Sequence, residues 1–145
     1  MASRTRRSGI VGAIVDLFKQ IDGSSSYLSN TYDNVYPKLI FWDEIKDFPT
    51  ISVVAGQESR EYLPSDFKWG FLLINIRIYV EGDDPKELLE DLFADMETML
   101  DNNNSLTIDS NTECTDIRIL SISDDEGLLA PLGVGEMTLQ VRYTA

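Results

Sequence analysis

Histidine does not occur in the 145 residues of this chain, and cysteine occurs once, at Cys114. Without histidine, the chain lacks the usual general base of serine and cysteine nucleophiles, the commonest zinc ligand and the main charge switch near neutral pH. One cysteine cannot form an intramolecular disulfide or a Cys-x-x-Cys site, so we expect Cys114 to be a half-buried small apolar residue. The commonest hydrolytic and zinc-dependent mechanisms are therefore disfavoured.

Long apolar runs are also missing. The longest one, residues 71–74, ends at Asn75 and is far shorter than the roughly 20 residues of a membrane helix. Residues 10–15, which follow the basic N-terminus, are too few for the apolar part of an export signal, and Asp16 interrupts them. We therefore expect a soluble cytoplasmic protein that makes no contact with membranes.

Positive charge is scarce, because 12 lysines and arginines stand against 25 aspartates and glutamates, for a net charge of -13. This balance repels a polyanion and argues against tight nucleic-acid binding. The one basic cluster, Arg4, Arg6 and Arg7, lies in residues 1–7, which we predict to be a flexible arm. The arm is either an ordinary solvated tail or a contact for an acidic partner.

Length and composition predict one globular domain over residues 1–145. The chain is 43% hydrophobic and 26% charged, and a chain of this length can bury its own core without a metal or a disulfide. Apolar residues at helical spacing predict a helix over residues 8–21. Residues 22–34, rich in serine, asparagine, aspartate and tyrosine, follow as a loop that is long for a compact domain.

A second helix is predicted to begin after Asp84. This side chain can cap free backbone N–H groups, Pro85 suits the first helical position, and Glu87 stands where a capping-box acid belongs. Leucine, phenylalanine and methionine residues then trace a buried stripe over residues 88–100. Local signals and periodicity agree on this helix.

Four strands are predicted, over residues 49–56, 69–80, 115–123 and 134–143, and residues 59–63 are a candidate extension of the first strand as a hairpin arm. In 69–80 the residues alternate between two faces, and the second face mixes apolar with polar side chains, as expected if it meets another subunit or a flanking loop. The order helix, two strands, helix, two strands predicts an α+β fold. Its central sheet is mostly antiparallel or mixed, with four to five strands and both helices packed on one face.

The motifs that bind nucleotides or calcium are absent or incomplete. Gly133-Val134-Gly135 lacks the third glycine and the following helix of a dinucleotide fingerprint, and no phosphate-binding Gly-x-x-x-x-Gly-Lys-Ser/Thr loop occurs. A calcium loop starting at Asp101 fails at its sixth and twelfth positions. We therefore predict no catalytic residue, no cofactor and no metal ligand.

Carboxylates cluster beside two turns, where paired-acid chemistry has to be considered. The clusters comprise Glu81, Asp83 and Asp84 in one turn and Asp124, Asp125 and Glu126 in the other. We interpret them as solvated loop residues, with Asp84 used for capping. A small acidic enzyme that acts through carboxylates and a divalent metal is the alternative.

Aromatic and apolar side chains in loops and at strand edges are the candidates for contacts between proteins. The aromatic ones are Tyr27, Tyr32, Trp42 and Trp69. The apolar ones lie in one connection between acidic and glycine-rich flanks and are Leu128, Leu129, Pro131 and Leu132. Core packing is the alternative for the aromatic residues, and the apolar connection either folds over the core or is covered by a partner.

Several segments together resemble the tail terminator, or tail-completion, proteins of long-tailed bacteriophages. The segments are the helix 10–21, residues 47–56, the strand 71–80 running into Glu81-Gly82-Asp83-Asp84, the helix 88–100 and the closing residues 135–143. The resemblance covers most of the chain and rests on the order of the elements and the style of the strands. No catalytic motif contributes to it.

The resemblance implies a structural protein that forms a ring, usually a hexamer, on the last ring of the tail tube. Such a ring stops tube polymerisation and offers a surface to the head-side connector, while DNA passes through its lumen without specific binding. It would belong to the tail or neck of the virion and be assembled in the host cytoplasm. A head-side neck or connector protein and a monomeric acidic adaptor that binds a peptide along a sheet edge are the alternatives.

For such a ring, we expect subunit and partner contacts in the basic arm, in residues 22–34 and in residues 128–133. The two carboxylate clusters are candidates for an acidic lumen or loop face. Neither the subunit number nor the face that carries the charge follows from the sequence.

Overall fold

Six strands form one mixed sheet in the computed structural model, which describes residues 6–24, 26–103, 105–107 and 113–144. The strands are β1 (Val35–Tyr36), β2 (Thr50–Tyr62), β3 (Lys68–Glu81), β4 (Leu106–Thr107), β5 (Glu113–Asp124) and β6 (Leu132–Thr144). The described residues also form the helices α1 (Arg6–Lys19) and α2 (Pro85–Asn102) and the short 3₁₀ helix η1 (Trp42–Glu44). The predicted α+β class is confirmed, as is the order of the helices and the four long strands.

The strand order across the sheet is β1-β2-β3-β6-β5-β4. Neighbours pair antiparallel, except that β1 runs parallel to β2. The central strands β3 and β6 pair from Trp69 opposite Thr144 to Glu81 opposite Leu132. β1 and β4 have two residues each, too few to show the alternation by which a sequence reveals a strand.

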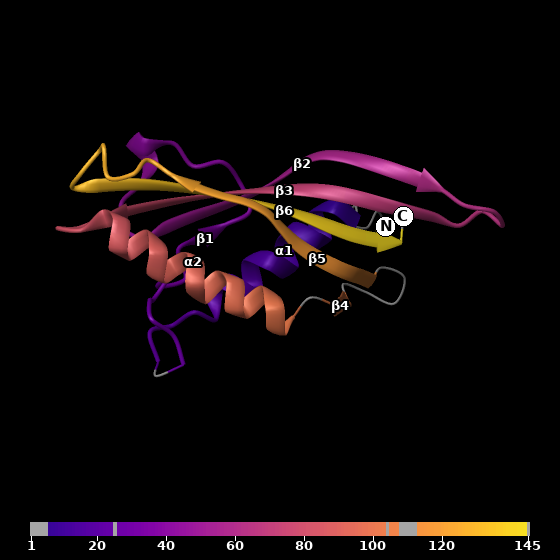
Figure 1. Ribbon diagram of the computed structural model, residues 1–145, viewed down its shortest axis with the longest axis horizontal. Helices are drawn as coiled ribbons and strands as arrows, with labels where there is room; N and C mark the ends of the chain where they lie inside the picture. The colour runs from indigo at the N-terminus through magenta and orange to yellow at the C-terminus, as the bar shows by residue number, and fades with distance from the viewer. Residues whose placement is uncertain (1–5, 25, 104, 108–112, 145) are drawn as a thin grey trace.

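Both helices lie on the same face of the sheet, as predicted (Figure 1). Every second residue of β3 from Leu72 to Val80 is on this face and buried. α1 contacts β2, and α2 contacts β6, β3 and β5, so side chains of helices and strands share one core. Removal of this apolar surface from water is the main driving force for the fold.

Two glycines in β6 let α2 approach the sheet closely. A Cβ atom at Gly135 would lie 2.6 Å from Cζ of Phe93 and 3.0 Å from Cδ2 of Leu89. A Cβ atom at Gly133 would lie 2.9 Å from Cβ of Pro85. Because there is no room for a side chain at either position, the Gly-Val-Gly sequence serves the packing of α2 against β6.

The face of the sheet away from the helices is covered in part by residues 37–47, which include η1 (Figure 1). There the buried Tyr79 donates a hydrogen bond from its hydroxyl to the carbonyl of Ile40, at 3.2 Å. Farther along the same face, the guanidinium of Arg142 lies 4.5 Å from the ring centroid of Trp69. One end of the mixed face therefore meets a flanking segment of the chain itself.

The predicted N-terminal arm has to be corrected at its C-terminal boundary. α1 begins at Arg6, within the predicted arm 1–7. The half-buried Arg7 donates a hydrogen bond from its guanidinium to the carbonyl of Gly56 in β2. Arg7 thus fastens α1 to the sheet, whereas Arg4 lies outside the described residues.

β2 continues past residue 56 into the expected hairpin arm, and with β3 it forms a hairpin that extends beyond the helices (Figure 1). At its base, the buried Tyr143 donates a hydrogen bond to Oε1 of Glu58, and Nε of Arg60 lies 2.7 Å from Oε2 of the same carboxylate. Burial acts to raise the pKa of Glu58, but the hydrogen bonds from Tyr143 and Arg60 outweigh it, so the pKa lies below the ordinary 4.5. Burial and the bond to Glu58 raise the pKa of Tyr143 to about 12.

These shifts predict how stability depends on pH. The contribution of Glu58 is present above pH 4.5 and is lost as the pH falls through its lowered pKa. The contribution of Tyr143 is present below pH 10 and is lost as the pH rises towards 12. We expect Tyr143→Phe to lower the free energy of unfolding by about 1 kcal/mol near neutral pH. Between pH 10 and 12, the free energy of unfolding is expected to decline less in this variant than in the wild type.

Urea unfolding of the wild type and the variant across this pH range measures the effect. Tyr62→Phe is the control, because the Tyr62 side chain is 74% exposed on the same hairpin. An equal alkaline decline in all three proteins would contradict the assignment to Tyr143.

Candidate functional site at the acidic end of the sheet

The two predicted carboxylate clusters lie together at one end of the sheet, although 39 residues separate Asp84 from Asp124 in sequence. Glu81 in β3 is paired with Leu132 in β6, and the backbone N–H of Gly82 donates to the carbonyl of Pro131 at 2.9 Å. Residues 81–91 and 124–132, which we call the acidic end, contain nine carboxylates and one lysine. This end holds more than half of the net charge of the chain.

Three of these carboxylates organise the local backbone. Oδ1 of Asp84 accepts from the N–H of Glu87 at 3.3 Å, so the predicted helix cap is confirmed. The Asp124 carboxylate accepts the N–H of Glu126, and the Asp125 carboxylate accepts the N–H groups of Gly127 and Leu129, so both shape the β5–β6 loop.

The single lysine of the acidic end, Lys86, joins its two halves. Its Nζ lies 2.6 Å from Oδ2 of Asp124 and 3.0 Å from Oε1 of Glu90. The hydrogen bond from Lys86 lowers the pKa of Asp124 and raises the pKa of the lysine itself. Because this ammonium already faces two carboxylates, the acidic end remains strongly negative.

The apolar connection after β5 projects from the acidic end. Leu128 is 85% exposed and Leu129 is 50% exposed, while Leu132 is half-buried at the start of β6. The sequence left open whether this connection folds over the core or is covered by a partner. In the isolated chain, Leu128 does not fold over the core. We call Leu128 and Leu129 the leucine knob.

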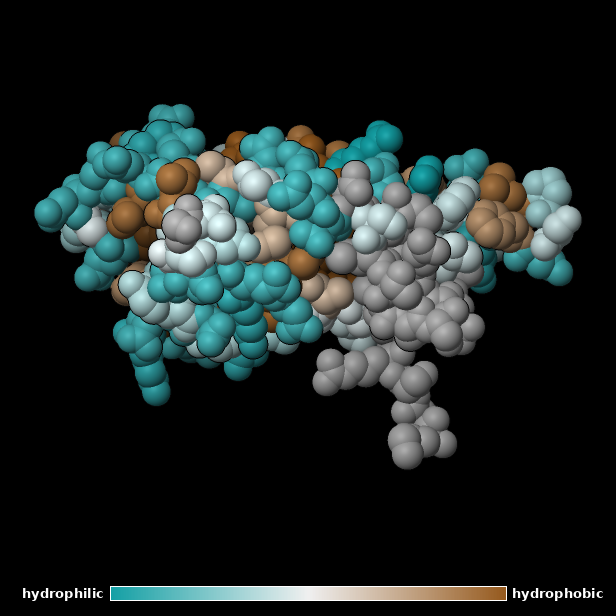
Figure 2. Space-filling model, turned by 90° about the horizontal axis from the view of Figure 1, so that it is seen from below, coloured by the Kyte–Doolittle hydropathy of each residue, from teal (hydrophilic) through white to brown (hydrophobic). Residues whose placement is uncertain are grey.

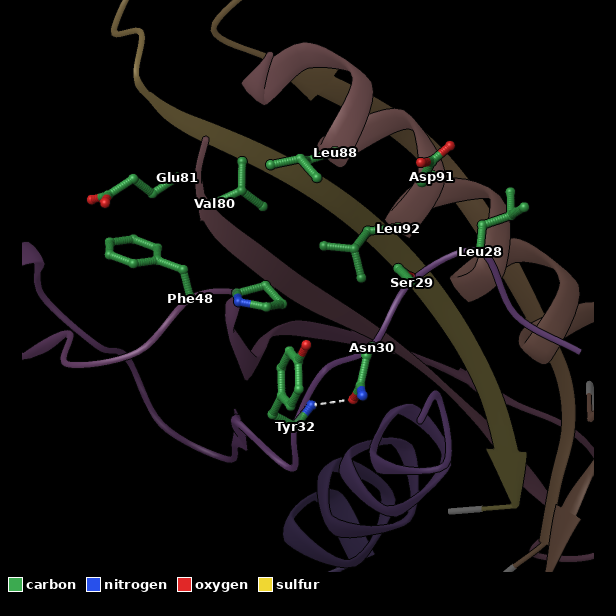
Figure 3. Close-up of a pocket in the computed structure, with 11 residues that line it drawn as sticks. Leu28, Ser29, Asn30, Tyr32, Phe48, Val80, Glu81, Leu88, Asp91 and Leu92 are labelled. Carbon is green, nitrogen blue, oxygen red and sulfur yellow. Dashed lines mark hydrogen bonds between the residues drawn. The ribbon is translucent and has the colours of Figure 1, made fainter. Parts of the chain in front are cut away.

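An apolar hollow of about 250 Å³ lies beside the acidic end (Figure 3). Val80, Leu88 and Leu92 supply one side of it from β3 and α2, and Tyr32 stands opposite with its hydroxyl directed towards the centre. The remaining lining residues are Leu28, Ser29, Asn30, Phe48, Pro49, Glu81 and Asp91. Seen from the side of the helices, apolar residues interrupt a hydrophilic surface at this end of the molecule (Figure 2).

Carboxylates stand on two sides of the hollow. Glu81 lies beside Phe48 at one side, and Asp91 lies on α2 at the other, with both carboxylates directed away from the apolar floor (Figure 3). The hollow therefore offers an apolar floor and a negative rim.

Asp95 holds the loop that forms one wall of this hollow. Its carboxylate, 5% exposed on α2, accepts hydrogen bonds from the N–H groups of Leu28 and Ser29, at 2.8 to 3.0 Å, and from the Ser29 hydroxyl. This residue was not predicted from the sequence, although its position indicates burial. Asp95 stands three residues after Leu92 and four before Met99, within the apolar stripe of α2. A carboxylate in such a stripe needs hydrogen-bond donors when it is buried.

Thr31 fixes the same loop to α1. Its buried hydroxyl donates to the carbonyls of Phe18 and Ile21, and its N–H donates to Ile21 at 2.9 Å. These bonds satisfy carbonyl groups at and beyond the end of α1. Residues 22–34 were predicted to be a long loop, and the structure shows that this loop is anchored to both helices.

Of the other predicted contact residues with described side chains, Tyr32 lies beside the acidic end, whereas Tyr27 and Trp69 lie elsewhere. Tyr27 is half-buried and packs against the core, whereas Tyr32 is exposed in the hollow. Trp69 lies on the mixed face of the sheet under Arg142, with the Phe67 ring 5.0 Å away. Trp42 begins η1, and its side chain, like that of Arg6, lies outside the part that the structure describes.

Two kinds of site are not found in the described part of the chain. The cysteine, aspartate and glutamate residues described there form no group of three or more that could hold a metal ion. None of its helices is long and apolar enough to cross a membrane.

The chain is similar to proteins of viral tails. It matches the family model described as Bacteriophage Tail Tube Terminator Protein over residues 4–145. It is 41% identical over 149 positions to the tail tube terminator protein p142 of Escherichia phage T5, which covers 94% of this chain and 92% of that protein. Its fold resembles that of a chain from the virion of a native gene transfer agent particle, with a TM-score of 0.65 and 10% identity over 99% of this chain and 100% of the other.

Proposed function

Because this chain belongs to the family of bacteriophage tail tube terminator proteins, a family of structural virion proteins, we propose that it forms a closed ring of identical subunits on the last ring of the tail tube. The ring is a hexamer that ends tube polymerisation. Its other side provides the joining surface for the head-side connector.

The two unlike edges of the sheet support the ring. Among the described residues, β1 pairs only with Ile51 and Ser52, so residues 53–62 of β2 have no strand neighbour on that side. On the opposite edge, in the part of the chain that the structure describes, β4 pairs only with residues 113–114, and residues 116–124 of β5 have no strand neighbour on that side. Contacts between two different edges are heterologous, and they close into a ring when each subunit is rotated by a fixed angle from the last.

Further contacts, with neighbouring subunits or with partner proteins of the tail, come from the leucine knob, from residues 22–34 and from the basic arm. The knob leaves apolar surface exposed that a neighbour would bury, and the loop 22–34 presents the exposed Leu28 and Tyr32 from an anchored backbone. The net charge of -13 allows DNA to pass through the lumen without sticking to it.

The exposed leucine knob is the single observation that carries the ring, and it can be tested. Native mass spectrometry over a concentration series, with negative-stain images with and without tail tubes, is expected to show hexameric rings free or on tube ends. Leu128→Asp with Leu129→Asp is expected to abolish ring formation and leave a folded monomer, because two carboxylates replace apolar contact surface.

Leu39→Asp with Phe41→Asp is the matched control, since it places two carboxylates at exposed apolar positions that are 45% and 59% exposed and lie outside the proposed contacts. It is expected to assemble like the wild type. A wild-type protein that stays monomeric at every concentration and never associates with tube ends would refute the proposal and favour a monomeric adaptor. Rings formed equally by the knob variant would remove the knob from the interface.

A further inference from the structure

Resting on the proposed function, we propose that the hollow beside the acidic end is the socket for the tail tube. It receives an apolar side chain that the tube protein presents at the tube end, with lysine or arginine residues beside it. Three features of the hollow support this role: an apolar floor, a negative rim and a wall that hydrogen bonds hold in place before a partner binds.

The size and lining of the hollow fit a protein side chain. Its volume of about 250 Å³ is below the roughly 300–1,000 Å³ of ordinary small-molecule pockets. Leu28 and Leu88 at its margin remain 68% and 40% exposed, so apolar surface is left for an occupant to cover. Burial of an apolar anchor in such a pocket is the usual centre of a protein interface.

The charge of the rim selects the partner. Glu81 and Asp91 line the hollow, and the acidic end beside it contains seven further carboxylates and one lysine, Lys86. A second copy of this end, or DNA, would bring more negative charge and be repelled. An occupant with cationic neighbours meets complementary charge, and the same rim prevents a second terminator ring from docking through its own acidic end.

The fixed wall lowers the cost of docking. Asp95 and Thr31 hold residues 28–31 against both helices before any partner arrives. Binding therefore does not have to order this segment, and less of the interaction energy is lost to conformational entropy.

The test uses tail tubes assembled without terminator and the full-length protein. The double variant Glu81→Lys with Asp91→Lys reverses the charge of the rim. The control, Glu97→Lys with Asp101→Lys, makes the same charge change at exposed positions in the C-terminal half of α2. Circular dichroism and native mass spectrometry establish that both variants fold and assemble like the wild type before binding is compared.

The readouts are the fraction of capped tube ends and the protein concentration for half-maximal capping, at low and high salt. We expect the rim variant to need at least about tenfold more protein and to lose most of the salt dependence, whereas the control stays close to the wild type. Leu28→Gln with Leu88→Gln, which keeps the charge, is expected to weaken capping at both salt concentrations.

Different results would refute the terminator role and the socket. If the wild type caps no tubes at any salt concentration, the terminator role itself is refuted. If the wild type caps tubes and the rim variant caps them as well as the control does, the terminator role stands and the socket is overturned.

Discussion

Asp95→Leu is expected to lower the free energy of unfolding by about 3 kcal/mol, one of the two largest effects we anticipate for a single substitution. The change removes a buried acceptor and leaves the N–H groups of Leu28 and Ser29 and the Ser29 hydroxyl without it. Asp95→Asn, which keeps one acceptor oxygen but no charge, is expected to lose less.

Urea unfolding and limited proteolysis measure the two consequences of the Asp95 variants. We expect the loop 22–34 to become the first site of cleavage in Asp95→Leu, because its anchor on α2 is gone. Glu97→Leu is the control, since Glu97 is exposed two residues further along α2. Unchanged stability and an uncut loop in Asp95→Leu would show that the loop does not depend on this carboxylate.

Gly135→Val is expected to be comparably destabilising, by about 3 kcal/mol, although valine is normally favoured over glycine in a strand. The added Cβ would already overlap the Phe93 ring at 2.6 Å, and two further methyl groups have to fit between β6 and α2. α2 must then shift away from the sheet, which opens the core that both share.

Substitution of a second glycine, Gly12, is expected to stabilise the protein. Gly12 lies within α1, and a Cβ atom at this position would meet no other part of the molecule within 4 Å beyond its own turns of helix. Gly12→Ala is therefore expected to raise the free energy of unfolding by about 0.5–1 kcal/mol through helix propensity. Urea unfolding of both variants decides the matter, and a Gly135→Val protein as stable as the wild type would contradict the close packing of α2.

Local interactions explain what the sequence alone determined. Asp84 caps the backbone of its own helix, and the apolar stripe of that helix repeats every three to four residues, so α2 was predictable from nearby residues. The alternation of β3 likewise records which face is buried. These signals, with the order of the elements, were enough for the α+β class and for the resemblance to tail terminators.

Tertiary structure decided what depends on residues far apart in the chain. The sequence shows two separate carboxylate clusters, and only the pairing of β3 with β6 brings them to one end beside the hollow. The sequence places Arg7 in a basic arm, and only the fold brings it to its acceptor, the carbonyl of Gly56, 49 residues away. Asp95 meets its donors 66 and 67 residues away, and such long-range contacts have no fixed spacing in a sequence, since chain topology alone sets them.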